Sequence, residues 1–239
     1  MDEFNQRQSN YFDRYAQTPQ AEVTQSPADQ IEWQAFKAVI GDLKGKKVLD
    51  LGCGAGRYSI RCAEDAEEVI GTDLSPVSIE LANQNAASRG LQNMKALVFD
   101  FKEIRWERYF DRAILVNMLH HTSEAEQILQ NLSLSLKEDG SLVIFENNSM
   151  NPLFIPFFIK LGQLGSHWSR QYLRSNLFSL KKLLEANGFV VEEIHRYGFL
   201  PTGLYNRSLV FKKINDCLNR IPVVNWFTAF YIIRARPRP

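Results

Sequence analysis

The sequence feature that most restricts how this chain can fold is a glycine-rich stretch that directly follows a short apolar run. Residues 48–59 read VLDLGCGAGRYS, so glycines occupy three alternate positions, Gly52, Gly54 and Gly56. An apolar strand, a loop with such glycines and then a helix are typical of the first unit of a doubly wound α/β sheet. Glycines permit a tight turn and a close approach of a ligand to the backbone, and the start of the helix offers free N–H donors. We therefore expect a polar or anionic part of a ligand at this loop.

The pattern around this loop is that of a parallel sheet with connecting helices. Short apolar runs alternate with longer amphipathic stretches between residues 46 and 147, which predicts βαβ units. The expected strands there are 47–51, 68–72, 94–99, 111–117 and 141–146, and the expected helices are 56–65, 75–89 and 123–137. Beyond them we expect a helix at 179–186, a strand at 189–197, a helical insertion at about 199–226 and a strand at 226–234. The prediction is an α/β fold, Rossmann-like and doubly wound, with helices on both faces of seven mostly parallel strands and an antiparallel last strand.

We expect one domain, because no internal repeat or low-complexity tract divides the chain. A capping residue, Ser26, precedes Pro27 and begins a helix that Gly41 ends. Aromatic side chains among polar ones in residues 1–24 predict an aromatic helix or flap. In this division residues 1–41 are an N-terminal flap and helix, 42–147 the ligand-binding core, 148–178 an insertion or lid, and 179–239 the part that completes the sheet.

The charge balance limits the classes of partner. Lys and Arg number 28 and Asp and Glu 27, for a net charge of +1, which lacks the basic excess that nucleic-acid binding needs. Three cysteines that lie far apart make a disulfide framework or a structural zinc site unexpected. The first residues show no signal-peptide pattern, and the most apolar run, 153–164, is too short to span a bilayer. We therefore expect a cytoplasmic protein with no nucleic-acid partner, no metal and no transmembrane segment.

Acidic residues stand where three of the predicted strands end. Asp50 lies at the end of the first strand, Asp73 at the end of the second and Asp100 at the end of the third. Because the carboxyl ends of parallel strands share one edge of the sheet, these carboxylates face the same crevice. Such a cluster suits a ligand with an amine, a ribose and an adenine amino group. The structural alternatives are that Asp73 belongs to the turn that caps the helix after Ser75, and that Asp100 is solvated.

Two nucleotide-binding alternatives fit the loop less well. No Gly-Lys-Ser/Thr follows the glycines, as a phosphate loop requires. For a dinucleotide loop the third glycine comes one position early and leaves Arg57 where a glycine is wanted. Asp50 would also repel a pyrophosphate, whereas it would favour an ammonium or a sulfonium. A dinucleotide-binding oxidoreductase therefore stays only as an alternative.

Together these motifs resemble the class I S-adenosylmethionine-dependent methyltransferase family, and within it the type 11 branch that acts on small molecules. The resemblance covers residues 46–147 through VLDLGCGAGRYS, VIGTDLS, LVFDF, FDRAILVNMLHHT and LKEDGSLVIFENN, and more loosely 179–197. It implies S-adenosylmethionine as the cofactor and S-adenosylhomocysteine as its product.

The resemblance also implies roles for single residues at the methionine end of the cofactor. The backbone would approach the methionine part and the ribose edge at four loop residues, Gly52, Cys53, Gly54 and Gly56. Asp50 would lie under the methionine amine. Asn117, at the end of the fourth strand, would flank the methionine and its methyl group.

At the nucleoside end the same resemblance implies four contacts. Asp73 would accept hydrogen bonds from the ribose hydroxyls, with Leu74 against the adenine. Asp100 would accept from the adenine amino group, and the N–H of Phe101 would point at the ring.

Candidate catalytic residues follow the fourth strand. A general base is needed when the methyl acceptor is a hydroxyl, an acidic carbon or a protonated amine. His120 and His121 come where the loop enters the crevice and are the candidate bases, and the alternative is a buried ring that bonds the loop. The resemblance adds that a histidine is often present at the position of His121, and His167 is a further candidate. This loop has neither an Asn/Asp-Pro-Pro-aromatic signature for base amines nor clustered acids for magnesium.

The segment after the fifth strand is rich in apolar and aromatic side chains. Residues 150–165 read MNPLFIPFFIKLGQLG, and Trp168, Tyr172 and Phe178 follow. Such residues suit a hydrophobic acceptor or shallow docking on a membrane surface, and the alternatives are a lid, a cover for the sheet or a dimer contact. We predict a methyltransferase for a small-molecule or lipid-like acceptor, preferably at oxygen. The alternative from another class is a non-catalytic subunit that keeps the cofactor pocket.

Overall fold

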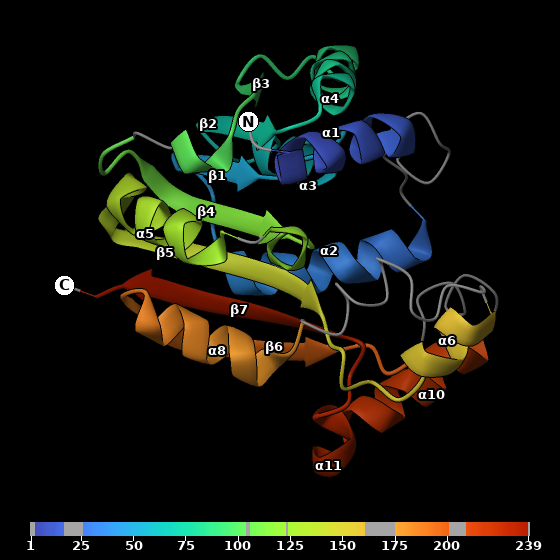
Figure 1. The fold of residues 1–239 in the computed structure, drawn as a ribbon. Coiled ribbons are helices and arrows are strands. Elements are labelled where there is room, and N and C mark those ends of the chain that lie inside the picture. Colours follow the sequence, from blue (N-terminus) through green and yellow to red (C-terminus); the bar gives the residue numbers. More distant parts are fainter. Residues whose placement is uncertain are drawn as a thin grey trace.

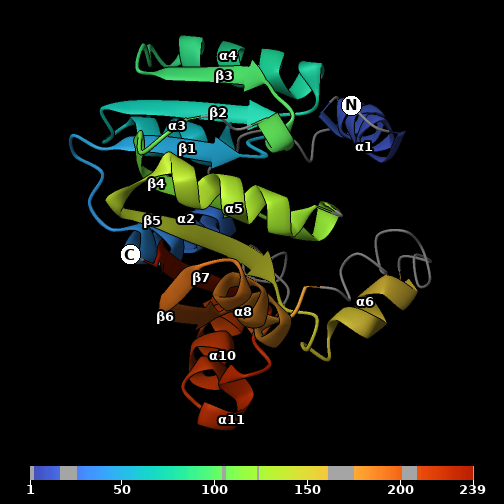
Figure 2. The ribbon, with the colours of Figure 1, turned by 60° about the vertical axis from the view of Figure 1, so that its left-hand side comes forward.

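The computed structural model describes residues 3–16, 26–103, 106–122, 124–160, 175–200 and 209–238. In this part the strands form one seven-stranded sheet in the order β3-β2-β1-β4-β5-β7-β6 (Figures 1 and 2). Neighbouring strands from β3 to β5 are parallel, and β7 runs antiparallel to β5 and β6. The strands are β1 (Lys47–Leu51), β2 (Glu68–Asp73), β3 (Met94–Val98), β4 (Phe110–Val116), β5 (Leu136–Asn147), β6 (Phe189–Tyr197) and β7 (Phe230–Pro237). The predicted fold class is confirmed.

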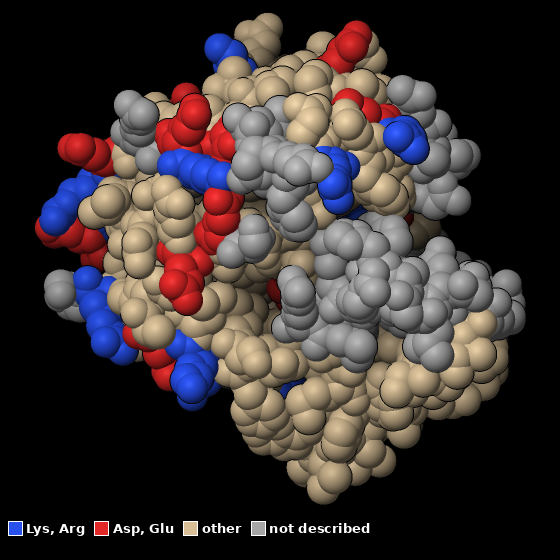
Figure 3. All heavy atoms as spheres, in the orientation of Figure 1, with Lys and Arg blue, Asp and Glu red and all other residues tan. Residues whose placement is uncertain are grey.

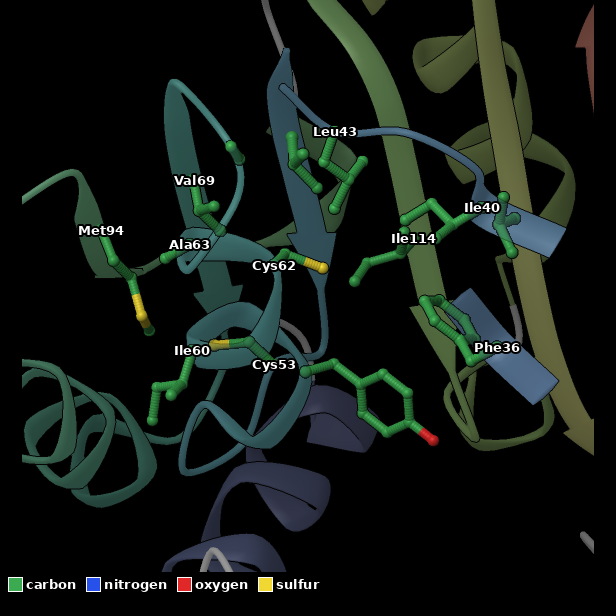
Figure 4. Packing of buried hydrophobic residues seen from close by; sticks show 14 of the residues in the cluster. Phe36, Ile40, Leu43, Cys53, Ile60, Cys62, Ala63, Val69, Met94 and Ile114 are labelled. Carbon is green, nitrogen blue, oxygen red and sulfur yellow. The ribbon is translucent and has the colours of Figure 1, made fainter. Parts of the chain in front are cut away.

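Helices pack on both faces of the sheet. One layer contains α2 (Pro27–Ile40), α3 (Arg57–Ala63) and α4 (Pro76–Ser88), and the other contains α5 (Ala125–Ser135) and α8 (Leu177–Ala186). Figure 4 shows part of the first layer, where Phe36 of α2, Cys62 of α3 and Ile114 of β4 fill the space between the helices and the sheet. The remaining elements are α1 (Glu3–Ala16), η2 (Phe101–Glu103), η3 (Leu119–His121), α6 (Phe154–Lys160), α10 (Leu209–Asn219) and α11 (Pro222–Asn225).

Strand β1 shows why the centre of the sheet is so apolar. Val48 packs in the α2–α4 layer and Leu49 in the α5–α8 layer, because successive residues of a strand point to opposite faces. Both faces are covered by helices, so a central parallel strand is apolar at nearly every position. Lys47 begins β1 and is half-buried, and Asp50 is the one buried charged residue of this strand, at 1% exposure.

Two predicted strands differ from the structure. For the other strands, and for the helices whose first and last residues were both predicted, these residues agree with the structure within two positions. The fifth strand begins at Leu136 and not at Ser141. Helix α5 ends at Ser135, and Leu136 pairs with Phe110 before a register shift. Gly140, predicted to end the connection, lies inside β5 at this irregularity, where a Cβ would come within 2.9 Å of the Lys137 carbonyl oxygen. The strand is therefore longer than its apolar run.

The predicted last strand is wrong at its start, because β7 begins at Phe230 and not at Trp226. The side-chain amide of Asn148 donates to the carbonyl oxygens of Trp226 (3.1 Å) and Thr228 (2.9 Å). These carbonyls therefore bond to a side chain and not to a neighbouring strand. Of the helices that the structure describes, none is long and apolar enough to cross a membrane.

Candidate active site

A cavity of about 580 Å³ lies at the carboxyl edge of the central strands. Its wall comes from α1, from the loop after β1, and from the ends of β2, β4 and β5. The predicted site residues on this wall are Asp50, Gly52, Cys53, Gly54, Asp73, Leu74, Phe101, Asn117, His120 and His121. Gly56 and Asp100 are not among the residues that line it. The volume lies within the range of about 300–1,000 Å³ that is common for small-molecule sites.

The glycines of the loop serve two different purposes. Gly54 has φ of +53°, and no described atom lies within 4 Å of the place that a Cβ would take, so its backbone is open to a ligand. Gly56 precedes α3 with φ of +86°, and a Cβ there would come within 3.2 Å of Ala82 on α4. Gly56 therefore permits close helix packing, which differs from the ligand contact predicted for it.

Asp50 is a buried carboxylate on the cavity wall. Its Oδ2 accepts a hydrogen bond of 2.5 Å from Ser59 Oγ. Burial is the main cause that raises the pKa of Asp50 to about 7; the Ser59 hydrogen bond acts against this rise and the charge of Asp73 acts with it. A cationic group of a ligand at this position would stabilise the charged carboxylate.

Asp73 joins the glycine loop to the turn after β2. Its Oδ2 accepts from the N–H of Gly54 and its Oδ1 from the N–H of Ser75, each at 2.9 Å. Burial raises the pKa of Asp73, and these N–H donors oppose the rise. Ser75 itself caps α4 by accepting from the N–H of Ser78. Asp73 thus has the capping-turn position that the sequence allowed, and it also lies on the cavity wall.

The third predicted acid is placed differently. The carboxylate of Asp100 accepts from the N–H of Lys102 (3.2 Å) and so belongs to the turn that forms η2. Phe101, the next residue, is buried and lines the cavity together with Leu74. The structure therefore brings Asp50, Asp73, Leu74 and Phe101 together and leaves the Asp100 side chain outside this group.

The loop after β4 carries the two candidate bases. Asn117 has φ of +51°, and its Oδ1 accepts from Asn147 Nδ2 at 3.0 Å. His120 follows in η3, with its Nδ1 2.6 Å from Oε2 of Glu146 and a side chain that is 6% exposed. The ring of His121 lies 4.1 Å from that of His120 and meets Phe12 of α1 edge to face at 5.2 Å.

Glu146 is a functional candidate that sequence reasoning missed. It is 2% exposed, and its Oε1 accepts from the N–H of Leu119 at 2.9 Å. Ser175 donates from its Oγ toward Oε2 of Glu146 (3.2 Å) and toward the carbonyl oxygen of Asn147 (2.6 Å). The carbonyl of Ser175 accepts from the N–H of Ser149 at 2.8 Å. The residues on either side of segment 150–174 are therefore joined beside the partner of His120.

Helix α1 forms part of the cavity wall. In the sequence, only the aromatic residues among polar ones in this segment indicated such a role. Phe12 and Tyr15 line the cavity. The helix is attached to the turn after β2, because Ser9 Oγ donates to the carbonyl oxygen of Leu74 (3.0 Å) and Asp13 Oδ1 accepts from Ser75 Oγ (2.6 Å). Of the two forms predicted for residues 1–24, a helix or a flap, the structure has a helix over Glu3–Ala16.

A charged cluster joins α2 to the start of α3 and was also missed. One guanidinium nitrogen of Arg57 lies 2.6 Å from Asp29 Oδ1 and 2.6 Å from Glu32 Oε1, and Tyr58 donates to the same Glu32 oxygen. Burial raises the pKa of Glu32, and the charge of Arg57 works against that rise. Among the described residues on the cavity wall, Arg57 is the one Lys or Arg.

Some of the predicted positions lie outside the described residues. These are His167, Trp168 and Tyr172. Among the residues that the structure does describe, no group of three or more His, Cys, Asp or Glu side chains is placed to hold a metal ion.

The fold and the site together define a class of protein. The last strand in the sequence, β7, lies between β5 and β6 and runs antiparallel to both. A glycine loop follows β1. Carboxylates at the ends of β1 and β2 face one cavity. These are the features of the class I S-adenosylmethionine-dependent methyltransferases. Residues 42–184 match a family described as "Methyltransferase domain", and the chain belongs to this family.

Curated relatives give a narrower comparison. The chain is 29% identical over 170 residues to the ubiquinone biosynthesis O-methyltransferase of Glaesserella parasuis, covering 66% of this chain and 71% of the relative. It is 33% identical over 143 residues to that of Actinobacillus pleuropneumoniae, covering 55% of this chain and 61% of the relative. The enzyme of the same name from Nitrosomonas europaea is matched over 61% of its length. The chain therefore spans about three fifths of the length of several of these relatives.

Solved structures share the fold at low sequence identity. The [4+2]-cyclase SpnF has a TM-score of 0.64 and 20% identity, covering 88% of this chain and 81% of its own. An S-adenosylmethionine-dependent methyltransferase from Mesorhizobium loti has a TM-score of 0.62 and 18% identity, covering 86% and 97%. A cyclase and a methyltransferase share this fold, so the fold alone does not define the reaction.

The cofactor of this methyltransferase is S-adenosylmethionine. The described residues fit it, since Asp50 is a buried carboxylate that needs a cation and Gly54 leaves its backbone open to the cavity. The family match favours the methyltransferase over the oxidoreductase alternative, and the enzyme over a non-catalytic subunit.

Proposed function

We propose that this methyltransferase acts on a hydroxyl oxygen of a small, largely apolar acceptor, with His120 as the general base. The observation that carries the proposal is His120 on the cavity wall, paired with the buried Glu146 behind it at 2.6 Å between Nδ1 and Oε2. A histidine held by a carboxylate in this way is the usual arrangement for accepting a proton at its other ring nitrogen.

Glu146 determines which nitrogen of His120 is available. Its Oε1 is occupied by the N–H of Leu119, so its Oε2 faces Nδ1 of His120. A proton on Nδ1 then leaves Nε2 unprotonated, and Nε2 takes the proton of the acceptor hydroxyl as the oxygen gains its methyl group. S-adenosylmethionine, when bound, supplies a methyl group activated by a positively charged sulfur. The further task of the protein is to align the hydroxyl with that methyl group and to exclude water.

His121 is the second candidate base, but its position favours another task. Its ring packs edge to face on Phe12 of α1, so it joins the helix to the loop after β4. We therefore assign His121 to the wall of the acceptor site and His120 to proton transfer.

For the cofactor we propose contacts on each of its parts. Asp50 holds the amine, Asp73 the ribose hydroxyls, and Leu74 and Phe101 the adenine. Arg57 is the candidate partner of the carboxylate on the methionine part of the cofactor. The loop Gly52–Gly54, with Cys53, lies along the methionine part, and Asn117 flanks the methyl group. All of these residues line the same cavity, but Asp100 has no place in this arrangement.

The acceptor class is supported by two observations. Apolar and aromatic side chains contribute to the wall near the candidate base, among them Phe12, Val116 and Met118. The relatives named above are called O-methyltransferases of ubiquinone biosynthesis, at 25–33% identity. A phenolic hydroxyl on an apolar molecule agrees with both.

The test is methyl transfer by the purified full chain to a panel of phenols, amines and thiols, with S-adenosylhomocysteine release as the readout. We expect turnover of phenols with apolar substituents, and a fall in kcat of at least about 100-fold for His120→Ala, as for loss of a general base. His121→Ala is the matched control and should retain most of kcat. Turnover of amines alone, or full activity of His120→Ala on phenols, would contradict the proposal.

A further inference from the structure

Helix α10 exposes several of its apolar side chains. Phe211 is 36% exposed and Ile214 is 44% exposed. Of the side chains described on this helix, only Asn215 is buried, at 5% exposure. Asn215 Oδ1 accepts from the N–H of Phe199 (2.6 Å) and of Leu200 (3.2 Å). The helix is thus held to the protein by a polar residue while apolar residues face outward, whereas a surface helix usually buries its apolar side.

The exposed apolar side chains continue along the chain beyond this helix. Val223 on α11 is 71% exposed, and Ile221, Trp226 and Phe227 around it are 47%, 45% and 37% exposed. These exposed side chains together are called the α10–α11 surface, which consists of Phe211, Ile214, Ile221, Val223, Trp226 and Phe227. In Figure 3 the bottom of the molecule, where α10 and α11 lie, is tan nearly throughout, whereas blue and red gather on the left. Tan marks every described residue other than Lys, Arg, Asp and Glu, so Figure 3 shows a face with little charge, and the six exposures show that large apolar side chains there meet solvent. Large apolar side chains exposed together mark a place of contact with another phase or molecule.

Positive charge is concentrated in the same part of the sequence. Residues 150–230 contain ten Lys or Arg and four Asp or Glu, a net charge of +6. The rest of the chain contains eighteen Lys or Arg and twenty-three Asp or Glu, a net charge of −5. Arg196 lies 4.7 Å above the ring of Trp226, and Lys213 and Arg220 are exposed on and just after α10. Among the described charged side chains on α10, just after it and against Trp226, three are basic (Lys213, Arg220 and Arg196) and one is acidic (Asp216), so the local balance is positive.

We propose that the α10–α11 surface docks on an anionic lipid bilayer. Short helices with Trp and Phe side chains and flanking basic residues bind the interface of such a bilayer through apolar burial and electrostatic attraction. A second copy of this chain would bring the same positive charge to the contact, and like charges repel. The proposal does not depend on the acceptor, since it concerns a surface formed by α10 and α11 and not the cavity.

The experiment is co-flotation of the full chain with vesicles of phosphatidylcholine, with and without phosphatidylglycerol. We expect binding to the vesicles with phosphatidylglycerol, and weaker binding in high salt or to phosphatidylcholine alone. The double variant Ile214→Asp with Val223→Asp should lower the partition coefficient by at least about tenfold. The matched control is Leu134→Asp on α5, which also replaces an exposed apolar side chain, 66% exposed, and should bind as the unaltered protein does.

Two results would overturn the proposal. Equal vesicle binding by the double variant and the unaltered protein would show that another surface makes the contact. A dimer in light scattering that the double variant splits, without vesicle binding, would make this surface a subunit interface. Unchanged binding of S-adenosylhomocysteine by the double variant confirms that it is folded.

Discussion

The cavity and the α10–α11 surface depart from ordinary burial in opposite ways. At the candidate active site, Asp50 on the cavity wall and Glu146 behind His120 are 1% and 2% exposed. At the other end, Ile214 and Val223 are 44% and 71% exposed while Asn215 is buried. Burying a charge and exposing a large apolar group both cost free energy. Glu146 is balanced from within the chain, by His120, Leu119 and Ser175. For Asp50 and for the exposed apolar side chains we propose a partner outside the chain, the cofactor amine in one case and a bilayer in the other.

The sharpest test of this contrast compares one residue type in the two regions. Ile114 in β4 is 0% exposed, so Ile114→Ala should lower the free energy of unfolding by about 2–5 kcal/mol through lost burial and the cavity left behind. Ile214→Ala should change it by less than about 0.5 kcal/mol. Denaturant unfolding of the full chain measures both. Similar losses for the two variants would mean that α10 packs on the protein through its apolar side.

The carboxylate beside His120 should matter to the rate and not to folding alone. Glu146→Gln keeps the shape of the side chain but loses its charge, and we expect kcat to fall about 100-fold with little change in the affinity for S-adenosylhomocysteine. Steady-state kinetics and calorimetry separate these two effects. Ser175→Ala is the milder companion, because it removes a donor to Glu146 and keeps the carboxylate. If Glu146→Gln loses cofactor affinity together with rate, Glu146 supports the fold of the loop more than the base.

Asp73 and Asp100 form a matched pair for the cofactor site, since both were predicted ligands and only Asp73 lies on the cavity wall. Asp73→Ala should weaken binding of S-adenosylhomocysteine by at least about tenfold, as the loss of hydrogen bonds to a charged group does. Asp100→Ala should leave it unchanged. Calorimetry on both variants decides, and an effect of Asp100→Ala alone would reverse the assignment.

The smallest effect we predict is a pH dependence from Asp50. Burial raises the pKa of Asp50 in the folded state to about 7, above its ordinary value of 3.8, so the folded state holds this proton more tightly than the unfolded chain does. In the ligand-free protein, Asp50 should therefore contribute fully to the free energy of unfolding below about pH 4. This contribution is lost as the pH rises toward about 7. Binding of the cofactor amine needs the charged form, so the affinity for S-adenosylhomocysteine should rise by up to about tenfold between about pH 6 and about pH 8. In Asp50→Asn this rise should disappear, and its persistence would assign the titration to another group.

The first half of the sheet could be predicted because its signals are local. Strand β1, the glycines after it and the acids at the ends of β1 and β2 lie in one short stretch and follow from the βαβ pattern. The predicted positions of Asp50 and Asp73 on one cavity follow from the shared edge of parallel strands. Gly56 shows the limit of this reasoning, because its contact with Ala82 depends on how two helices pack.

The rest of the site depends on contacts between residues far apart in the sequence. Glu146 meets His120 only because β4 and β5 pair with Val116 beside Phe145. Arg57 meets Asp29 because α2 packs next to the start of α3. The start of β7 is determined by the Asn148 side chain, which no local propensity indicates. Such pairings carry no periodic signal, so sequence reasoning could name His120 but not its partner.

The hydrogen bond between Ser149 and Ser175 has an evolutionary consequence. The chain leaves the sheet and returns at one point, and the side chain of Asn151 donates to the carbonyl oxygens of Phe199 and Phe227. A change of length after Asn151 therefore need not alter the strand register or the glycine loop. Insertions and deletions in this stretch can then accumulate among descendants while the cofactor site is kept. A chimera in which a relative supplies residues 152–174 would test whether this stretch influences the choice of acceptor.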